Sequence, residues 1–181
     1  MGNKFSLCFR IGMGKRDTHY KLMDPFCIFY LKFVKDQGFM TEPFWQQSIL
    51  SQPIVSWRGL AFENVCLDHI GQIKSALGIS GVKTNQSFWS VKPDDRDGTQ
   101  IDLIIERKDD VVNMCEMKYY NKEFASNKKY HDTIVNRREL LEESIQKGMV
   151  VHSTLITTYG LKYNEYSGDF DSVITMEELF R

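Results

Sequence analysis

The sequence predicts an α/β protein with a mixed β-sheet flanked by helices and an N-terminal helical extension. The first observation is a helical apolar stripe within residues 60–77, which ends just before a glycine. The second is a group of three strand-like segments between residues 82 and 120. The third is an amphipathic segment at residues 128–147, followed by a β-branched run at residues 150–158. The order helix, three strands, helix, strand implies a mixed sheet with helices on its faces.

Residues 1–56 are interpreted as an N-terminal extension that contains an aromatic helix. Asp24 followed by Pro25 is a helix-start signal, because the carboxylate can cap free N–H groups and proline is tolerated at the first helical position. Four aromatic residues then follow at helical spacing, before a glycine at position 38: Phe26, Phe29, Tyr30 and Phe33. Such a stripe is typical of a packing face, so we expect this helix to dock onto this domain or onto a missing one.

Residues 57–181 are interpreted as one domain that begins with the helix of the apolar stripe. Glu63 lies beside this stripe, near the start of the helix. Residues 82–91 form the first predicted strand. Residues 100–107 and 111–120 form two more strands around a short polar turn, which is a hairpin signal.

The rest of this domain is predicted to continue with a helix and a strand. The helix at residues 128–147 is amphipathic, and the run at residues 150–158 is typical of a buried strand. Residues 172–175 are expected to add an edge strand, and residues 176–181 a final helical turn.

Composition and charge exclude several classes of protein. No apolar run approaches the roughly 18 to 20 residues that span a bilayer, and the N-terminus does not resemble a secretory signal. We therefore expect a cytoplasmic protein without a membrane partner. The net charge of −1 and the pI of about 6.4 mean that any nucleic acid would bind to a local basic patch. The cysteines and histidines are scattered, so we expect buried thiols and no local zinc site. Gly12-Met13-Gly14-Lys15 is not a phosphate loop, because Arg16 stands where serine or threonine is needed.

Asp102, Glu116 and Lys118 are the polar residues that stand out within the apolar strands of the hairpin. Glu116 and Lys118 are two positions apart on one strand, so they share a face. Asp102 joins them only if it stands opposite Glu116, which requires a three-residue loop at positions 108–110 or a compensating bulge. A two-residue loop would place Asp102 opposite Met117, on the other face.

These residue types suit phosphoryl chemistry with a divalent cation. Two carboxylates supply the hard oxygen ligands that Mg²⁺ prefers, and the ion acidifies a bound water and neutralises charge on a phosphate. Lys118 could orient the water or stabilise developing charge, and Glu63 could add a third carboxylate. The alternative is a solvated sheet face with a cross-strand ion pair, which stabilises a protein by at most about 1 kcal/mol.

The motif Gly98-Thr99-Gln100-Ile101-Asp102-Leu103, followed by Cys115-Glu116-Met117-Lys118, resembles the PD-(D/E)XK nuclease superfamily. More narrowly, most of the chain resembles the C-terminal domain of prokaryotic AAA-type ATPases of the archaeal ATPase group. The stretches that carry this resemblance are Tyr20-Lys21-Leu22-Met23-Asp24-Pro25-Phe26, Trp57-Arg58-Gly59 with Phe62-Glu63, the hairpin, and Ile156-Thr157-Thr158-Tyr159-Gly160. The resemblance implies a restriction-endonuclease-like core at residues 57–181. It also implies that residues 1–56 are the remnant of a winged-helix junction, with the ATPase and winged-helix parts absent.

The resemblance implies a role for each residue of the motif. Asp102, Glu116 and the backbone carbonyl of Met117 would hold Mg²⁺ or Mn²⁺, with Glu63 as accessory carboxylate and metal ligand. Lys118 would be the catalytic lysine. No proline precedes Asp102; the alternative pair Pro93-Asp94 is rejected, because Asp94 opens a polar turn.

The expected activity is metal-dependent hydrolysis of phosphodiester bonds in nucleic acid, with DNA as the preferred substrate. Basic residues on or before the second helix, with tyrosines nearby, suit a nucleic-acid backbone: Lys122, Lys128, Lys129, Arg137 and Arg138. The alternative for each of them is a solvated helix face. The alternative function is a catalytically inactive nuclease-fold module that regulates or docks on an AAA-type ATPase; a second copy of the chain is a further possible partner.

Overall fold

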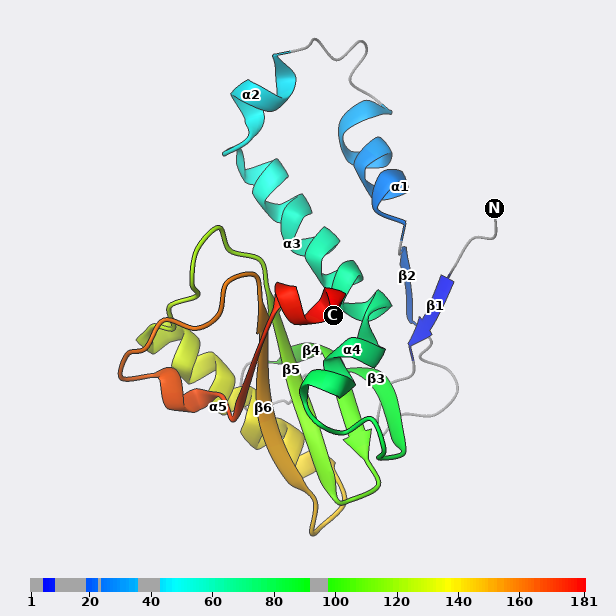
Figure 1. Cartoon of the computed structure of the whole chain (residues 1–181), viewed down its shortest axis with the longest axis vertical. Helices are drawn as coiled ribbons and strands as arrows, with labels where there is room; N and C mark the ends of the chain where they lie inside the picture. The colour runs from blue at the N-terminus through cyan, green and yellow to red at the C-terminus, as the bar shows by residue number, and fades with distance from the viewer. Residues whose placement is uncertain (1–4, 9–18, 23, 36–42, 92–97) are drawn as a thin grey trace.

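The computed structural model of the chain describes residues 5–8, 19–22, 24–35, 43–91 and 98–181. Its centre is a five-stranded sheet in the order β3-β4-β5-β6-β7 (Figure 1). The first three strands are antiparallel neighbours, whereas β5, β6 and β7 run parallel. The bounds of the strands are Thr84–Val91, Thr99–Arg107, Val111–Lys118, Val150–Thr157 and Ser172–Thr175 for β3 to β7. The predicted mixed sheet is confirmed, and its architecture is compatible with a restriction-endonuclease-like core.

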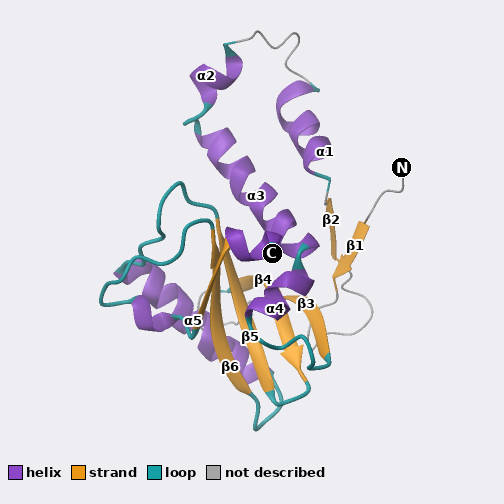
Figure 2. Cartoon of the chain, viewed as in Figure 1, coloured by secondary structure: helices purple, strands orange, loops and turns teal. Residues whose placement is uncertain are grey.

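Helices cover both faces of this sheet (Figure 2). α3 (Gln52–Asp68) and α4 (Ile70–Ala76) lie on one face, and α5 (Lys128–Ser144) lies on the other. One buried cluster joins α5 to Met114 of β5, and a second joins α3 and α4 to the neighbouring residue, Cys115. Because successive side chains of a strand point to opposite faces, these two clusters are the two sides of the core.

The single helix predicted at residues 60–77 is two helices, and the first of them begins earlier. α3 starts at Gln52, after the extended Ser51 and with a proline in its first turn. It crosses position 57, where the sequence suggested a domain boundary. The chain leaves the helical conformation at His69, whose N–H is bonded to the carbonyls of Val65 and Cys66, and α4 then begins at Ile70.

The elements after the hairpin follow the prediction closely. α5 begins at Lys128, where the side chain of Asn127 accepts a hydrogen bond from the N–H of Tyr130 (3.0 Å). It ends at Ser144, three residues before the predicted end. The expected edge strand is β7, and the expected final turn is the 3₁₀ helix η3 (Met176–Phe180). A second short 3₁₀ helix, η2 (Ser167–Asp169), precedes β7.

The N-terminal extension contains a small hairpin and an arm of helices. β1 (Phe5–Cys8) pairs with β2 (His19–Leu22) in an antiparallel sheet. α1 (Pro25–Phe29) continues as the π-helical η1 (Tyr30–Val34), and α2 (Phe44–Ser48) precedes α3. Figure 1 shows α1, α2 and the first turns of α3 extending beyond the sheet.

The aromatic helix packs against another helix of this chain, which was one of the two predicted alternatives. Asp24 caps it as expected, accepting a hydrogen bond from the N–H of Cys27 (2.7 Å). The rings of Phe29 and Phe33 pack against Trp57 of α3, with centroids 5.6 and 6.3 Å away. Phe26 instead is 70% exposed, so part of the aromatic stripe faces solvent. The predicted end of the helix at position 38 lies outside the described residues.

Two expectations drawn from composition can be compared with the structure. Across the described ranges, no helix has the length and apolar character that crossing a bilayer requires. Cys66 and Cys115 are buried free thiols, as expected. Cys27 is exposed, so the expectation of burial is wrong there, because the thiol lies on the outward side of α1. The side chain of Cys8 is outside the described part of the structure.

Candidate functional site

The hairpin of β4 and β5 has the register that the sequence argument required. Its loop is residues 108–110, and Asp110 adopts a positive φ of 63° there. Leu103 stands opposite Cys115, and Ile104 stands opposite Met114. One more step in this register would bring Asp102 opposite Glu116, but the ladder ends at Leu103 and Cys115.

A bulge interrupts the pairing of β4 with β3 at Asp102 and Leu103. Against β3, Ile104 pairs with Ser87 while Ile101 pairs with Trp89, so two residues of β4 oppose one residue of β3. Ile101 and Ile104 consequently pack into the same cluster on the α5 side.

Asp102 follows Ile101 and accepts a hydrogen bond from Nε2 of Gln100 (3.3 Å). Because the bulge interrupts strand alternation at Asp102, the pairing of the strands does not set the face on which its side chain lies. Glu116 points toward α5. The expectation that Asp102 lies on the face of Glu116 therefore stays a prediction.

Glu116 is the most deeply buried acidic residue of the predicted site. Its side chain is only 4% exposed, and both carboxylate oxygens contact α5. The hydroxyl of Tyr130 donates to Oε2 (2.8 Å), and Nη1 of Arg137 donates to Oε1. Lys118 lies 3.7 Å from Oε2 through its Nζ, and the same Nζ is 5.6 Å from the ring centre of Tyr130. The structure thus brings Glu116 and Lys118 together, as the spacing predicted.

Two residues of α5 that spacing could not assign complete this cluster. Burial raises the pKa of Tyr130 far above its ordinary value, and the adjacent Glu116 carboxylate raises it further. The phenol therefore remains a donor to Glu116. Arg137 bridges the two strands beyond the end of their ladder, because its Nε donates to Oγ1 of Thr99 (3.0 Å) on β4 while its Nη1 donates to Glu116 on β5.

The three carboxylates implied as metal ligands are not gathered at one point. Glu63 lies on α3, on the opposite face of the sheet from the α5 side toward which Glu116 points. Within the described ranges, no three histidine, cysteine or acidic side chains form a group that could hold a metal ion.

The donor set at Glu116 does not fit a divalent cation in this arrangement, because its carboxylate faces two cationic side chains. Carboxylate and carbonyl oxygens are the ligands Mg²⁺ takes, and a carboxylate as buried as Glu116 requires a positive partner. That partner is the guanidinium of Arg137 in this structure.

A polar groove of about 640 Å³ opens beside Arg137. It lies between the first residues of β4 and one face of α5, and its lining is Gly98, Thr99, Gln100, Lys129, Asp132, Thr133, Asn136 and Arg137. Two of the five basic residues predicted to bind nucleic acid, Lys129 and Arg137, are in this lining. The groove also contains Gln100, the hydrogen-bond donor to Asp102, on its β4 side.

The other predicted nucleic-acid contacts lie elsewhere. Lys122 is exposed after β5, and Lys128 forms an exposed ion pair with Asp132 (3.6 Å). Arg138 donates from Nη2 to the carbonyl of Val151 (2.9 Å) and pairs with Glu142, so it ties α5 to β6.

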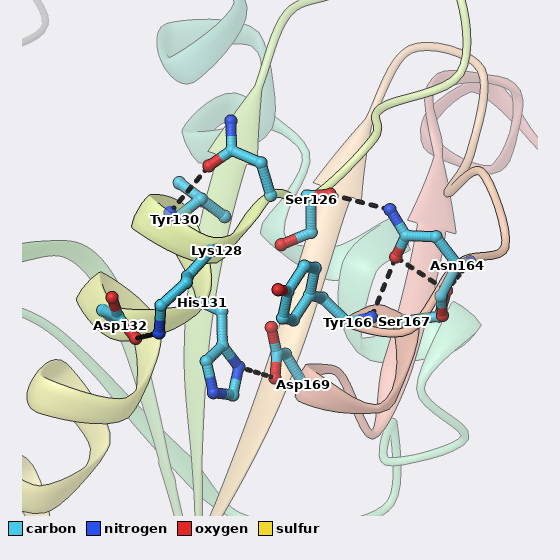
Figure 3. A network of polar contacts seen from close by, with 10 residues as sticks. Ser126, Lys128, Tyr130, His131, Asp132, Asn164, Tyr166, Ser167 and Asp169 are labelled. Atoms are coloured by element: carbon cyan, nitrogen blue, oxygen red, sulfur yellow. Dashed lines mark hydrogen bonds and ion pairs between the residues drawn. The ribbon is translucent and has the colours of Figure 1, made fainter.

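A second polar cluster joins α5 to the segment before β7 (Figure 3). Nδ1 of His131 lies 2.6 Å from Oδ1 of Asp169, whose side chain is 9% exposed. The ring of Tyr166 packs against His131 with centroids 5.2 Å apart. Asn164 donates to the carbonyl of Ser126 (2.7 Å). Sequence reasoning missed this cluster, because His131 and Asp169 are far apart in the chain and share no motif.

Comparison with known proteins adds little to this picture. No protein-family model matches the chain, and no curated protein matches it. One solved structure is similar in part, the crystal structure of a protein of unknown function, AF1548, with 17% identity and a TM-score of 0.41. The match covers 64% of this chain and spans 64% of that protein.

Proposed function

We propose that this chain hydrolyses phosphodiester bonds in nucleic acid, with DNA as the preferred substrate and Mg²⁺ or Mn²⁺ as cofactor. The observation that carries the proposal is the buried Glu116 with Lys118 beside it. The pair lies where the pairing of β4 and β5 ends, next to a groove lined by Lys129 and Arg137. A charge is costly at a position where both sheet faces are covered, so its presence there suggests a chemical role.

Each residue has a task that its surroundings support. Glu116 and Asp102 would hold the ion, together with the carbonyl of Met117. When bound, the ion supplies Lewis acidity and an activated water. Lys118 is 34% exposed in its side chain and lies at the end of β5, so its ammonium can face a phosphate and stabilise the charge that develops on it. Lys129 and Arg137 bind the phosphate backbone in the groove.

A cleavage assay on single- and double-stranded DNA, with Mg²⁺ or Mn²⁺, tests this proposal. Glu116→Gln and Lys118→Ala should each reduce the rate by about 100-fold or more, as the loss of one positioned electrostatic group does elsewhere. Asp102→Ala should have a similar effect, although Asp102 must turn from Gln100 to reach the ion. Activity that survives all three changes would mean that another site, or a contaminant, cuts the DNA.

A second candidate is a nuclease-fold module without catalysis that docks on an AAA-type ATPase. The observation that favours it is that both oxygens of Glu116 are already taken, by Arg137 and Tyr130. The helical arm is also rich in exposed apolar side chains, with Phe26 70% and Leu50 82% exposed. Absence of cleavage under every ionic condition, from a protein that is demonstrably folded, would favour this candidate.

A further inference from the structure

The loops that follow β5 and β6 carry three tyrosines that are open to solvent. Tyr120 follows β5, whereas Tyr159 and Tyr163 follow β6, and the two loops lie side by side beyond the ends of these strands (Figure 1). Tyr120 is 43% exposed, Tyr159 63% and Tyr163 92%. Single exposed rings are common on protein surfaces, but several on two adjoining loops form a surface that a partner can use.

Hydrogen bonds hold the two loops against each other. The N–H of Tyr120 donates to Oγ1 of Thr158 (2.9 Å), and this hydroxyl donates in turn to the carbonyl of Tyr120. Further along, the N–H of Phe124 donates to the carbonyl of Gly160 (2.8 Å), and the N–H of Lys162 donates to the carbonyl of Phe124 (2.7 Å). The backbone beneath the tyrosines is therefore ordered before a ligand arrives, which lowers the entropic cost of binding.

A row of rings connects these loops to the candidate site. Nζ of Lys118 lies 5.6 Å from the ring centre of Tyr130, which lies 5.0 Å from that of Phe124. The ring of Phe124 is in turn 5.3 Å from that of Tyr120. A chain of bases that lies on the exposed tyrosines would thus bring its backbone to Lys118.

Resting on the proposed function, we propose that Tyr120, Tyr159 and Tyr163 form a stacking surface for unpaired bases, so that the substrate is single-stranded nucleic acid. Every base has a face that stacks on an aromatic ring, and a single strand can turn these faces outward. A duplex keeps them covered by its own base pairs and offers the tyrosines only its backbone. Lys122 and Lys162, both exposed in the same loops, can meet the phosphates between the bases.

The charge of the two loops indicates that stacking, more than attraction of phosphates, supplies the affinity. Lys122 and Lys162 are balanced by the exposed Glu123 and Glu165. With Lys118 included, about three phosphates can be neutralised, and each contributes about −0.7 to the salt dependence of single-strand binding. We therefore expect the logarithm of the binding constant to fall with the logarithm of the salt concentration with a slope of about −2 or shallower.

Fluorescence anisotropy of the folded full chain with labelled DNA tests the proposal, in EDTA so that no strand is cut. The probes are a mixed-sequence single strand, the same sequence as a duplex, and a strand of abasic sites that keeps the phosphates but has no bases. We expect the single strand to bind at least about fivefold more tightly than either of the other probes, because only its bases can stack on the rings.

Variants assign this preference to the tyrosines. Tyr159→Ala and Tyr163→Ala should each weaken single-strand binding by about 5- to 150-fold for a base that stacks there, and should leave the abasic strand unaffected. Tyr159→Phe and Tyr163→Phe keep the ring and should keep the affinity. Tyr30→Ala is the matched control, because this tyrosine of η1 is as exposed as Tyr120 but lies on the helical arm. Circular dichroism confirms that each variant is folded.

The outcomes separate this inference from the proposed function. Equal affinity for the abasic and the base-containing strand, or alanine variants that bind like the wild type, would overturn the stacking surface and leave the proposed cleavage untouched. Single-strand binding that depends on the tyrosines, in a protein that cuts no DNA with any metal ion, would support the surface and refute the nuclease. A wild type that binds none of the probes would overturn both.

Discussion

Replacement of Arg137 by methionine should destabilise the fold more than most single substitutions, because it leaves Glu116 charged and buried. The carboxylate is 4% exposed and would retain only the hydroxyl of Tyr130 and the ammonium of Lys118, 3.7 Å away. Removing one partner of a buried ion pair costs about 3–5 kcal/mol. The two remaining donors place the expected loss near the lower end, at about 3 kcal/mol in the free energy of unfolding.

A double-mutant cycle measured by urea unfolding tests this value. Glu116→Gln should cost about 1–3 kcal/mol, because it leaves the Arg137 guanidinium short of an acceptor while part of it still reaches water. The double variant Glu116→Gln/Arg137→Met should cost less than the sum of the two single changes, by about 1–3 kcal/mol. Strict additivity, or a loss below about 1 kcal/mol for Arg137→Met, would refute the claim that this pair is coupled in the folded protein.

Three further outcomes follow from the buried groups. Because burial raises the pKa of Tyr130, its contribution to stability is present below about pH 10 and is lost as pH rises through the folded-state pKa; Tyr130→Phe should flatten that loss in urea unfolding above about pH 10. Iodoacetamide should label the exposed Cys27 in the native protein and spare Cys115, whose thiol pKa is raised by burial, as mass spectrometry would show. Asp169→Asn should weaken its contact with His131 and increase amide hydrogen exchange in residues 161–169, while exchange in β6 stays slow.

Much of the fold could be predicted from periodicity and from helix-capping signals. The strand and helix bounds after Thr84 agree with the prediction to within a few residues, since each element there has a clear period and polar ends. The helix over residues 60–77 was predicted less well. Its apolar stripe continues through His69, where the backbone leaves the helix. Its start lies earlier, at Gln52, where a proline stands in the first turn and Ile54 is fully buried.

The candidate site could be predicted only where spacing decides geometry. Glu116 and Lys118 share a face because they are two apart on a strand, and the structure confirms this. Asp102 depended on a hairpin register that proved right and on a bulge in β4 whose pairing with β3, Ile101 opposite Trp89, no local pattern specifies. Arg137 was expected to bind nucleic acid; its contact with Glu116 needed the docking of α5 onto the sheet, which no local pattern specifies.

The cluster of Glu116, Arg137 and Tyr130 is better explained by function than by folding. Met114 precedes Glu116 by two positions on the α5 side and is fully buried, so an apolar residue at 116 would continue the same row. Replacing a buried ion pair by apolar residues of similar volume is often neutral, or stabilises a protein by about 1–4 kcal/mol. We therefore expect Glu116→Leu/Arg137→Met to unfold at no lower urea concentration than the wild type, although Arg137→Met alone is destabilised. The same double variant should have lost DNA cleavage and Mn²⁺ binding. A double variant that is less stable than Arg137→Met alone would show instead that the charges hold the fold together, and the main argument for a chemical role of Glu116 would fail.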